Sequence, residues 1–143
     1  MCAHVTSWNS RTSVKFRTDV ASMCKLGFDI GLKDMKADEL TYCQEAVANY
    51  KRLKPVILDG DQYRLVSPYD GNHMAVMYTA PDASKPSSLP TTSIRVRRET
   101  TTGKLRGLDA QKMYRVKEIN LMPGRKSNLS GNEKIFSGDY LMK

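Results

Sequence analysis

A change in hydrophobic pattern near residue 54 constrains the fold of this chain more than any other feature. Before it, the apolar residues Leu40, Cys43, Val47 and Tyr50 recur at steps of three and four residues and form one stripe. Acidic residues open this stretch and basic residues close it, as the helix dipole favours. The pattern predicts a helix over residues 37–53. Pro55 predicts its end, because a proline disfavours helical geometry in the residue before it.

Beyond Pro55 the sequence consists of short candidate strands separated by turns rich in Gly, Pro and Asp. The candidate strands cover residues 56–58, 62–67, 74–78, 105–108, 113–120 and 135–137. Many short strands with such turns are typical of an antiparallel sandwich. We therefore expect an α/β piece over residues 1–54 and a small antiparallel all-β domain over residues 55–143. Residues 5–16 read as a strand end and a loop, and residues 17–27 are ambiguous between helix and strand.

The chain has 143 residues, enough for one ordinary domain or for the tail of one domain and a small second one. It holds no run of about 18 apolar residues, so no membrane span is expected. Residues 1–8 lack the basic flank and apolar stretch of a signal peptide, so none is expected. The three cysteines, Cys2, Cys24 and Cys43, match no zinc spacing, and we expect thiols, no metal site and no cofactor.

The net charge of +8 suggests a nucleic-acid partner, yet the basic excess is concentrated in residues 95–126. No helix-turn-helix pattern, zinc finger or aromatic RNA-binding strand accompanies it. We therefore expect no nucleic-acid partner. A basic binding protein remains a third hypothesis, which salt-dependent binding to DNA would support.

Seven segments, taken in order, resemble the α-galactosidases of glycoside hydrolase family 36, which act on raffinose-type sugars and melibiose. They are residues 1–5, 16–21, 26–30, 49–57, 60–68, 114–120 and 137–142. The first reads Met-Cys-Ala-His-Val and is similar to a Met-Gly-Ala-His-Val segment of that family, with Cys2 in place of its glycine. The order of the segments makes the resemblance specific. It covers nearly the whole chain apart from residues 85–102.

The resemblance implies a fold, namely the α/β tail of a (β/α)8 barrel followed by a small antiparallel all-β sandwich domain. Residues 1–54 would be the last strand or strands and the last helix of the catalytic barrel, and residues 55–143 the C-terminal sandwich. The implied parent is a retaining α-galactosidase that cleaves terminal α-galactosides with two carboxylates. We expect the parent to be a homo-oligomer of the bacterial cytoplasm or periplasm. The missing N-terminal part of that enzyme is a candidate partner of this chain.

The family motifs that carry the two catalytic carboxylates are Lys-x-Asp-x-Asn and a Ser-Asp-Asn type, and both precede the segment that resembles residues 1–5. Neither occurs here: residues 36–38 read Lys-Ala-Asp, but Leu40 stands where the motif has Asn. We therefore assign no catalytic residue and expect the chain to be inactive alone.

Four residues are candidates for sugar binding, because the resemblance places them in or near late barrel loops. They are His4, Trp8, Arg17 and Asp19. The alternative is that they orient loops or pack between the barrel and the sandwich. The side chain of Cys2, at a position where the family has glycine, could crowd the neighbouring backbone.

Residues 86–99 do not read as a strand of the sandwich, since they hold two prolines, a Ser/Thr cluster and three arginines. The family has an apolar strand here, of the type Ala-Val-Leu-Phe-Ala-Tyr. Codons can be chosen for residues 85–96 that, read in a shifted frame, give Ala-Val-Leu-Phe-Ala-Tyr-Asn-Ile-His-Pro-Arg. We therefore hypothesise a local frameshift, corrected near residues 100–102, that removes a buried strand. The coding DNA tests this hypothesis.

A stand-alone, non-catalytic carbohydrate-binding β-sandwich module is the alternative function. Trp8, Tyr63, Tyr69 and Tyr78 could stack on sugars, although scattered aromatic residues of this kind are more often part of a core. Oligosaccharide titration followed by tyrosine fluorescence separates this alternative from an inactive part of an enzyme.

Overall fold

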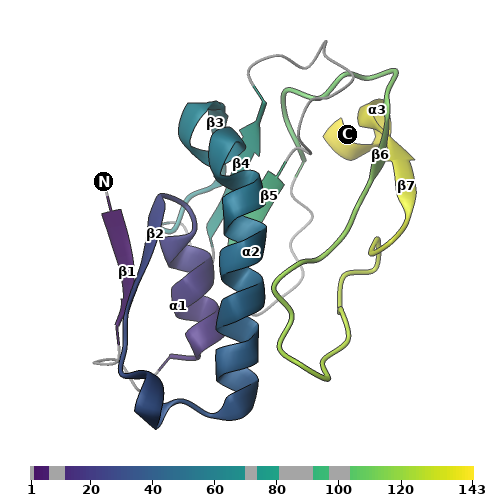
Figure 1. The fold of residues 1–143 in the computed structure, drawn as a ribbon. Helices are drawn as coiled ribbons and strands as arrows, with labels where there is room; N and C mark the ends of the chain where they lie inside the picture. The colour runs from purple at the N-terminus through teal and green to yellow at the C-terminus, as the bar shows by residue number, and fades with distance from the viewer. Residues whose placement is uncertain (1, 7–11, 70–73, 81–91, 97–103) are drawn as a thin grey trace.

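The computed structural model describes residues 2–6, 12–69, 74–80, 92–96 and 104–143 (Figure 1). Its first part contains β1 (Cys2–Thr6), α1 (Val14–Ala21), β2 (Lys25–Asp29), the 3-10 turn η1 (Leu32–Asp34) and α2 (Ala37–Asp59). Its second part contains β3 (Asp61–Val66), β4 (Met74–Thr79), β5 (Thr92–Val96), β6 (Met113–Arg115), β7 (Ile135–Ser137) and α3 (Gly138–Met142). The chain therefore changes from alternating strands and helices to short antiparallel strands after α2.

The first part is a β-α-β unit in which β1 and β2 pair in parallel, with Val5 opposite Phe28. Helix α1 connects the two strands. It begins at Ser13, whose side-chain oxygen accepts a 3.2 Å hydrogen bond from the backbone N–H of Phe16. The reading of residues 5–16 as a strand end followed by a loop is wrong for the last residues of that stretch, because they are already helical.

Two hydrophobic cores are arranged along α2. The first contains Val5, Val14, Ala21, Tyr42, Cys43 and Ala46, with Leu26 and Phe28 of β2 packed against it. The second contains Leu53, Val56, Ile57, Val76 and Tyr78. Because α2 contributes to both, this helix joins the β-α-β unit to the strands that follow. The predicted domain boundary between residues 54 and 55 lies inside this helix and remains a prediction.

The prediction that Pro55 ends the long helix is wrong, since α2 continues to Asp59 and residues 56–58 are helical rather than a strand. A proline inside a helix removes one backbone donor and leaves the carbonyl four residues earlier without its partner. Here both Pro55 and Lys51, which carries that carbonyl, belong to the exposed face, where water can hydrogen-bond to the carbonyl. Burial of Val56 and Ile57 in the second core offsets the remaining cost.

Strands β3, β4 and β5 form an antiparallel sheet in which β4 lies in the centre. The residues of β4 from Ala75 to Thr79 are all buried, so both faces of this strand are covered. Strand β5 lies within residues 86–99, and the expectation that this stretch forms no strand is wrong for Thr92–Val96. Its residues contain no proline, and β5 pairs with β4 only along one side, at the edge of the sheet.

The remaining C-terminal residues contain little regular structure. β6 and β7 form a separate two-stranded antiparallel sheet, with Tyr114 opposite Phe136. The ring of Tyr140 in α3 stacks on Phe136 with centroids 5.2 Å apart. Residues 105–108 form no strand, and only the first three residues of the predicted strand 113–120 are extended in one. The expected antiparallel pairing is therefore observed, but the described residues form two separate small sheets and include α3, and the all-β sandwich remains a prediction.

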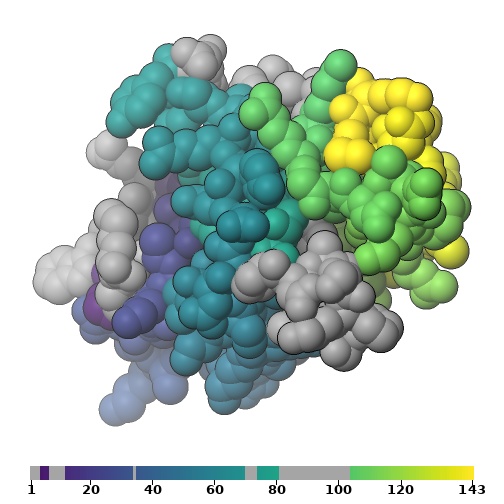
Figure 2. Space-filling model, turned by 90° about the horizontal axis from the view of Figure 1, so that it is seen from above, coloured from purple at the N-terminus to yellow at the C-terminus, as the bar shows by residue number. Residues whose placement is uncertain are grey.

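Figure 2 shows the C-terminal part, in green and yellow, as a lobe that lies against α2, in teal. Hydrogen bonds between α2 and this lobe include a 3.0 Å bond from the side-chain amide of Asn49 to that of Asn120. Among the described residues, no helix is both long and apolar enough to span a membrane.

Candidate functional site

The carboxyl ends of β1 and β2 lie at the same end of the β-α-β unit, because the two strands run in parallel. Thr6 and Asp29 are the last residues of the two strands and lie opposite each other. In folds built from such units, binding and catalytic residues collect at this edge of the sheet. We therefore take this end of the unit as the candidate functional site.

The antiparallel sheet contacts the opposite end of the unit. The hydroxyl of Tyr78 in β4 donates a 2.8 Å hydrogen bond to the carbonyl oxygen of Met23. Beside it, the hydroxyl of Tyr50 in α2 donates a 2.7 Å hydrogen bond to the carbonyl oxygen of Cys24. Both carbonyls lie just before β2 begins, at its amino end. The sheet of β3, β4 and β5 therefore meets the β-α-β unit at the amino end of β2, away from the ends of the strands at Thr6 and Asp29 (Figure 1).

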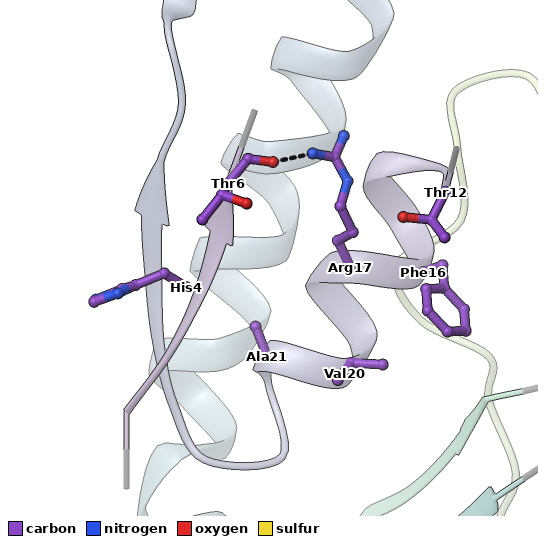
Figure 3. A pocket seen from close by; sticks show the side chains of 7 residues that line it. All are labelled: His4, Thr6, Thr12, Phe16, Arg17, Val20 and Ala21. Carbon is purple, nitrogen blue, oxygen red and sulfur yellow. Dashed lines mark hydrogen bonds between the residues drawn. The ribbon is translucent and has the colours of Figure 1, made fainter. Parts of the chain in front are cut away.

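A hollow of about 230 Å³ lies beside β1 and α1 (Figure 3). Its lining residues are His4, Thr6, Thr12, Phe16, Arg17, Val20 and Ala21. Two of the four predicted sugar-binding residues, His4 and Arg17, line this hollow, although the imidazole of His4 points away from Arg17 (Figure 3). Trp8 lies outside the described residues.

Arg17 holds the start of α1 against the end of β1. Its terminal nitrogen Nη1 donates a hydrogen bond to the backbone oxygen of Thr6. Its Nε atom is buried and has no hydrogen-bond partner in the part of the chain that the structure describes. Arg17 is therefore a direct structural link between α1 and the last residue of β1.

His4 projects from β1 and is exposed, and its imidazole lies over Gly27 of the neighbouring strand. A Cβ atom at residue 27 would lie 2.3 Å from the Cδ2 atom of His4, far inside contact distance. The glycine therefore makes room for the ring. The sequence indicated His4 as a site residue but gave no sign that its ring lies over Gly27.

Asp19 does not line the hollow, although it lies on the same helix as Arg17. Its carboxylate accepts a 2.8 Å hydrogen bond from the ammonium group of Lys15 and interacts with the side chain of Asn120. Burial raises the pKa of Asp19 above its usual value, while the contacts with Lys15 and Asn120 act in the opposite direction. Asp19 therefore links α1 to the C-terminal part of the chain.

The most buried polar groups of the unit are not arranged as a reactive site. The hydroxyl groups of Tyr42 and Thr18 are buried without a hydrogen bond of normal geometry to any described residue, and they lie close enough to influence each other. Burial raises the pKa of Tyr42, and it also raises the pKa of the Cys43 thiol. Both groups stay protonated near neutral pH, so neither is an activated nucleophile.

A second hollow, of about 310 Å³, lies between α2 and residues 117–121. Its lining residues are Glu45, Asn49, Arg52, Lys117, Glu118, Ile119, Asn120 and Leu121. It contains no aromatic ring on which a sugar could stack. The described residues also include no group of three or more His, Cys, Asp and Glu side chains placed to hold a metal ion.

Thr6 and Asp29 were missed by the sequence reasoning. The available signal was the alternation of Leu26 and Phe28 followed by an acid, which is typical of a buried strand that ends at a polar edge. That signal is short, and residues 17–27 could not be divided into helix and strand from the sequence.

The second half of the chain matches a known protein family. Residues 73–143 match the model of the glycosyl hydrolase family 36 C-terminal domain, and the chain belongs to this family. This confirms the resemblance read from the sequence segments.

Among curated proteins, the chain is similar to Alpha-galactosidase 1 of Pediococcus pentosaceus, with 28% identity over 132 residues. It is 34% identical over 105 residues to Probable alpha-galactosidase C of Aspergillus terreus. The matches cover 92% and 72% of this chain but only 16% and 14% of the two relatives. The chain therefore corresponds to a small share of these much longer proteins.

Among solved structures, the fold is similar to that of α-galactosidase AgaA from Geobacillus stearothermophilus. Variants of that enzyme in complex with raffinose and with stachyose each match with a TM-score of 0.73 and 23% identity. Each match covers 99% of this chain and 19% of the other. The β-α-β unit and the strands after it thus occur together in full-length members of the family.

Proposed function

We propose that this chain is the C-terminal part of a retaining α-galactosidase that hydrolyses terminal α-galactosides such as melibiose and raffinose. The observation that carries the proposal is the match of 92% of the chain to 16% of an α-galactosidase, and the likeness of its fold to part of AgaA supports it. We infer that residues 1–54 contribute the last strands and last helix of a (β/α)8 barrel. Residues 55–143 then contribute the C-terminal sandwich.

The chain alone has no hydrolase activity under this proposal. A retaining glycosidase needs two carboxyl groups about 5–5.5 Å apart on either side of the sugar carbon. The family motifs that supply them precede the region to which this chain corresponds. The candidate edge at Thr6 and Asp29 offers one strand-end carboxylate, which does not make such a pair by itself.

Within the assembled enzyme, we assign His4, Trp8, Arg17 and Asp19 to the surroundings of the sugar cleft. His4 is the best placed for direct contact, since it is exposed on β1. Arg17 and Asp19 act through the loops and helices that they hold in place, because their charged groups already contact Thr6 and Lys15.

Two measurements test the proposal. The purified chain is assayed with melibiose, raffinose and a chromogenic α-galactoside, and no turnover above background is expected. A chimera in which this chain replaces the matching region of AgaA is assayed in parallel and is expected to be active. Turnover by the isolated chain would contradict the proposal, and so would a folded chimera without activity.

The alternative of a stand-alone carbohydrate-binding module has less support. Tyr78 is 2% exposed and serves the contact between sheet and β-α-β unit, and Tyr63 is half-buried against Gly107. Tyr69 is 95% exposed, so nothing holds its ring ready for a sugar. Titration of the isolated chain with stachyose, followed by tyrosine fluorescence, tests this alternative, and no saturable change is expected.

A further inference from the structure

We propose that the hollow between α2 and residues 117–121 binds a hexose unit of a neutral oligosaccharide. Its volume is about 310 Å³, at the lower end of the range for small-molecule sites. It shares no lining residue with the hollow beside β1. Binding here goes beyond the proposed function, because it requires neither hydrolysis nor the pair of carboxylates on which hydrolysis depends.

Helix α2 places an acid, an amide and a base along one wall of the hollow. Glu45, Asn49 and Arg52 are separated by four and then by three residues, which brings them to the same side of the helix. Glu45 and Arg52 are about 10 Å apart along the helix axis. Neither forms an ion pair with a described residue, and Arg52 makes one long hydrogen bond, of 3.4 Å, from Nη2 to Oδ1 of Asn49. A carboxylate acceptor and guanidinium donors are therefore available to a molecule that lies between them.

Residues 117–121 form the opposite wall, which is held in place by hydrogen bonds on both sides. Asn120 has a φ of +57°, and its side-chain oxygen accepts the 3.0 Å hydrogen bond from Asn49. The backbone N–H of Glu118 donates a 2.7 Å hydrogen bond to Oδ1 of Asn132. A wall that is already ordered lowers the entropic cost of binding a ligand. The hollow is therefore formed before a ligand enters.

The charges around the hollow favour a neutral ligand over an ion. The charged lining residues are two acids and two bases, namely Glu45, Glu118, Arg52 and Lys117. Their charges sum to zero, so an ion of either sign is attracted by one pair and repelled by the other. A hydroxyl group both donates and accepts hydrogen bonds, so it suits carboxylates next to cationic donors. A hexose carries several hydroxyl groups on one small ring.

Apolar side chains complete the lining, although none of the lining residues is aromatic. Ile119 and Leu121 line the hollow, and both are half-buried. Ile119 also packs against the second core, which fixes its position. The C–H groups of a sugar ring can pack on such side chains, with less contact area than on an aromatic ring. We therefore expect weak binding, in the millimolar range.

An NMR titration of the isotope-labelled chain with raffinose tests the site. We expect saturable shifts of the backbone N–H signals within residues 45–52 and 117–121, together with the side-chain amide signals of Asn49 and Asn120. Tyrosine fluorescence does not report on this site, because no tyrosine lines the hollow.

Arg52→Met removes the guanidinium donors and keeps an unbranched side chain. We expect it to weaken raffinose binding about tenfold, since a hydrogen bond to a charged group is lost. Lys51→Met is the matched control, because Lys51 is the neighbouring exposed residue of α2 and does not line the hollow. It should bind raffinose as the wild type does. Equal thermal midpoints of the three proteins show that both variants are folded.

Glutamine is the control ligand, because it is zwitterionic and close to a hexose in size. We expect no saturable shifts with glutamine at the concentrations used for raffinose. The proposal is overturned if raffinose causes no saturable shifts, if the shifts lie outside the two segments, if Arg52→Met binds raffinose as tightly as the wild type, or if glutamine binds as tightly as raffinose. None of these results decides the proposed function, which is tested by the activity of the AgaA chimera.

Discussion

Asp19 carries a half-buried carboxylate whose environment makes its ionisation depend on folding. Burial raises the pKa of Asp19 in the folded chain above the ordinary value of 3.8. The folded state then binds this proton more tightly than the unfolded state. The contribution of Asp19 to stability therefore falls as the pH rises from that ordinary value through the raised pKa.

Asp19→Asn removes this pH dependence, because an amide does not titrate. We expect the free energy of unfolding of the variant, minus that of the wild type, to increase between about pH 3.5 and about pH 7. Urea unfolding of both proteins at several pH values measures this difference in free energy. A difference that stays constant or decreases with pH would contradict the burial of this carboxylate.

Gly60 is the residue at which α2 passes closely beside the end of β4. A Cβ atom here would lie 2.2 Å from the carbonyl oxygen of Thr79 and 2.4 Å from that of Val56. Both are backbone atoms and cannot rotate away. We expect Gly60→Ala to lower the free energy of unfolding by at least about 2 kcal/mol in urea titrations.

Gly124→Ala is the control for Gly60. Gly124 has a φ of +73°, and a Cβ atom added there would meet no atom within 4 Å, so only backbone strain is added, about 1 kcal/mol. Equal losses for the two variants would show that the close approach at Gly60 is not the cause.

At the residue scale, the sequence placed His4 and Arg17 near one site but could not separate Asp19 from them. Arg17 and Asp19 differ by two positions, which on a helix turns their side chains to different sides. Because α1 was not predicted, Arg17 and Asp19 could not be assigned to different neighbours from the sequence. Asp29 was missed for a similar reason, since the strand that ends there was not recognised.

Helix α2 shows how an element can continue where its sequence predicts an end. The prediction started the helix correctly at Ala37, but local geometry at Pro55 was outweighed by burial of the residues after it. β3, β4 and β7 were predicted close to their observed positions, because their apolar runs are bounded by turn residues. α1 was missed because eight residues with only weak apolar spacing do not define a period.

Pro55→Ala tests the cost of the proline in α2. The substitution restores the backbone donor and leaves no cavity, since Pro55 is exposed. We expect the free energy of unfolding to rise by about 1–3 kcal/mol in urea titrations. A loss of stability would instead show that the proline sets the direction in which the last turns of α2 reach the second core.

The β4 strand tests the frameshift hypothesis. Ala75 to Thr79 are covered on both faces, which favours an apolar strand beside them. Replacing residues 85–95 with Ala-Val-Leu-Phe-Ala-Tyr-Asn-Ile-His-Pro-Arg also exchanges residues 92–95 of β5. We expect the new apolar strand to pair with β4 in place of β5 and to raise the thermal midpoint, because each large side chain buried adds about 1.5–3 kcal/mol. Amide exchange along Met74–Thr79 should also slow.

A scrambled order of the same eleven residues is the control for that replacement. If the scrambled chain gains as much stability as the ordered one, or if neither gains any, the shifted frame does not encode a strand that pairs with β4.

At the scale of the whole molecule, α2 makes the two cores depend on each other. Leu53→Ala removes a side chain that is 5% exposed in the second core and should cost about 2–5 kcal/mol. Because the helix must stay intact to serve both cores, amide protection around Tyr42 in the first core should fall together with that around Val76. Hydrogen exchange read by mass spectrometry measures this, and loss confined to the second core would show two independent units.

The shared helix also limits how a gene of this type can be divided and recombined. A junction placed anywhere within residues 37–59 would divide α2, so that each product carries only part of the apolar stripe and lacks the residues that continue it. Shuffled or split versions of such enzymes are therefore expected to tolerate exchange points ahead of α2 or beyond Gly60, and to fail at points inside the helix.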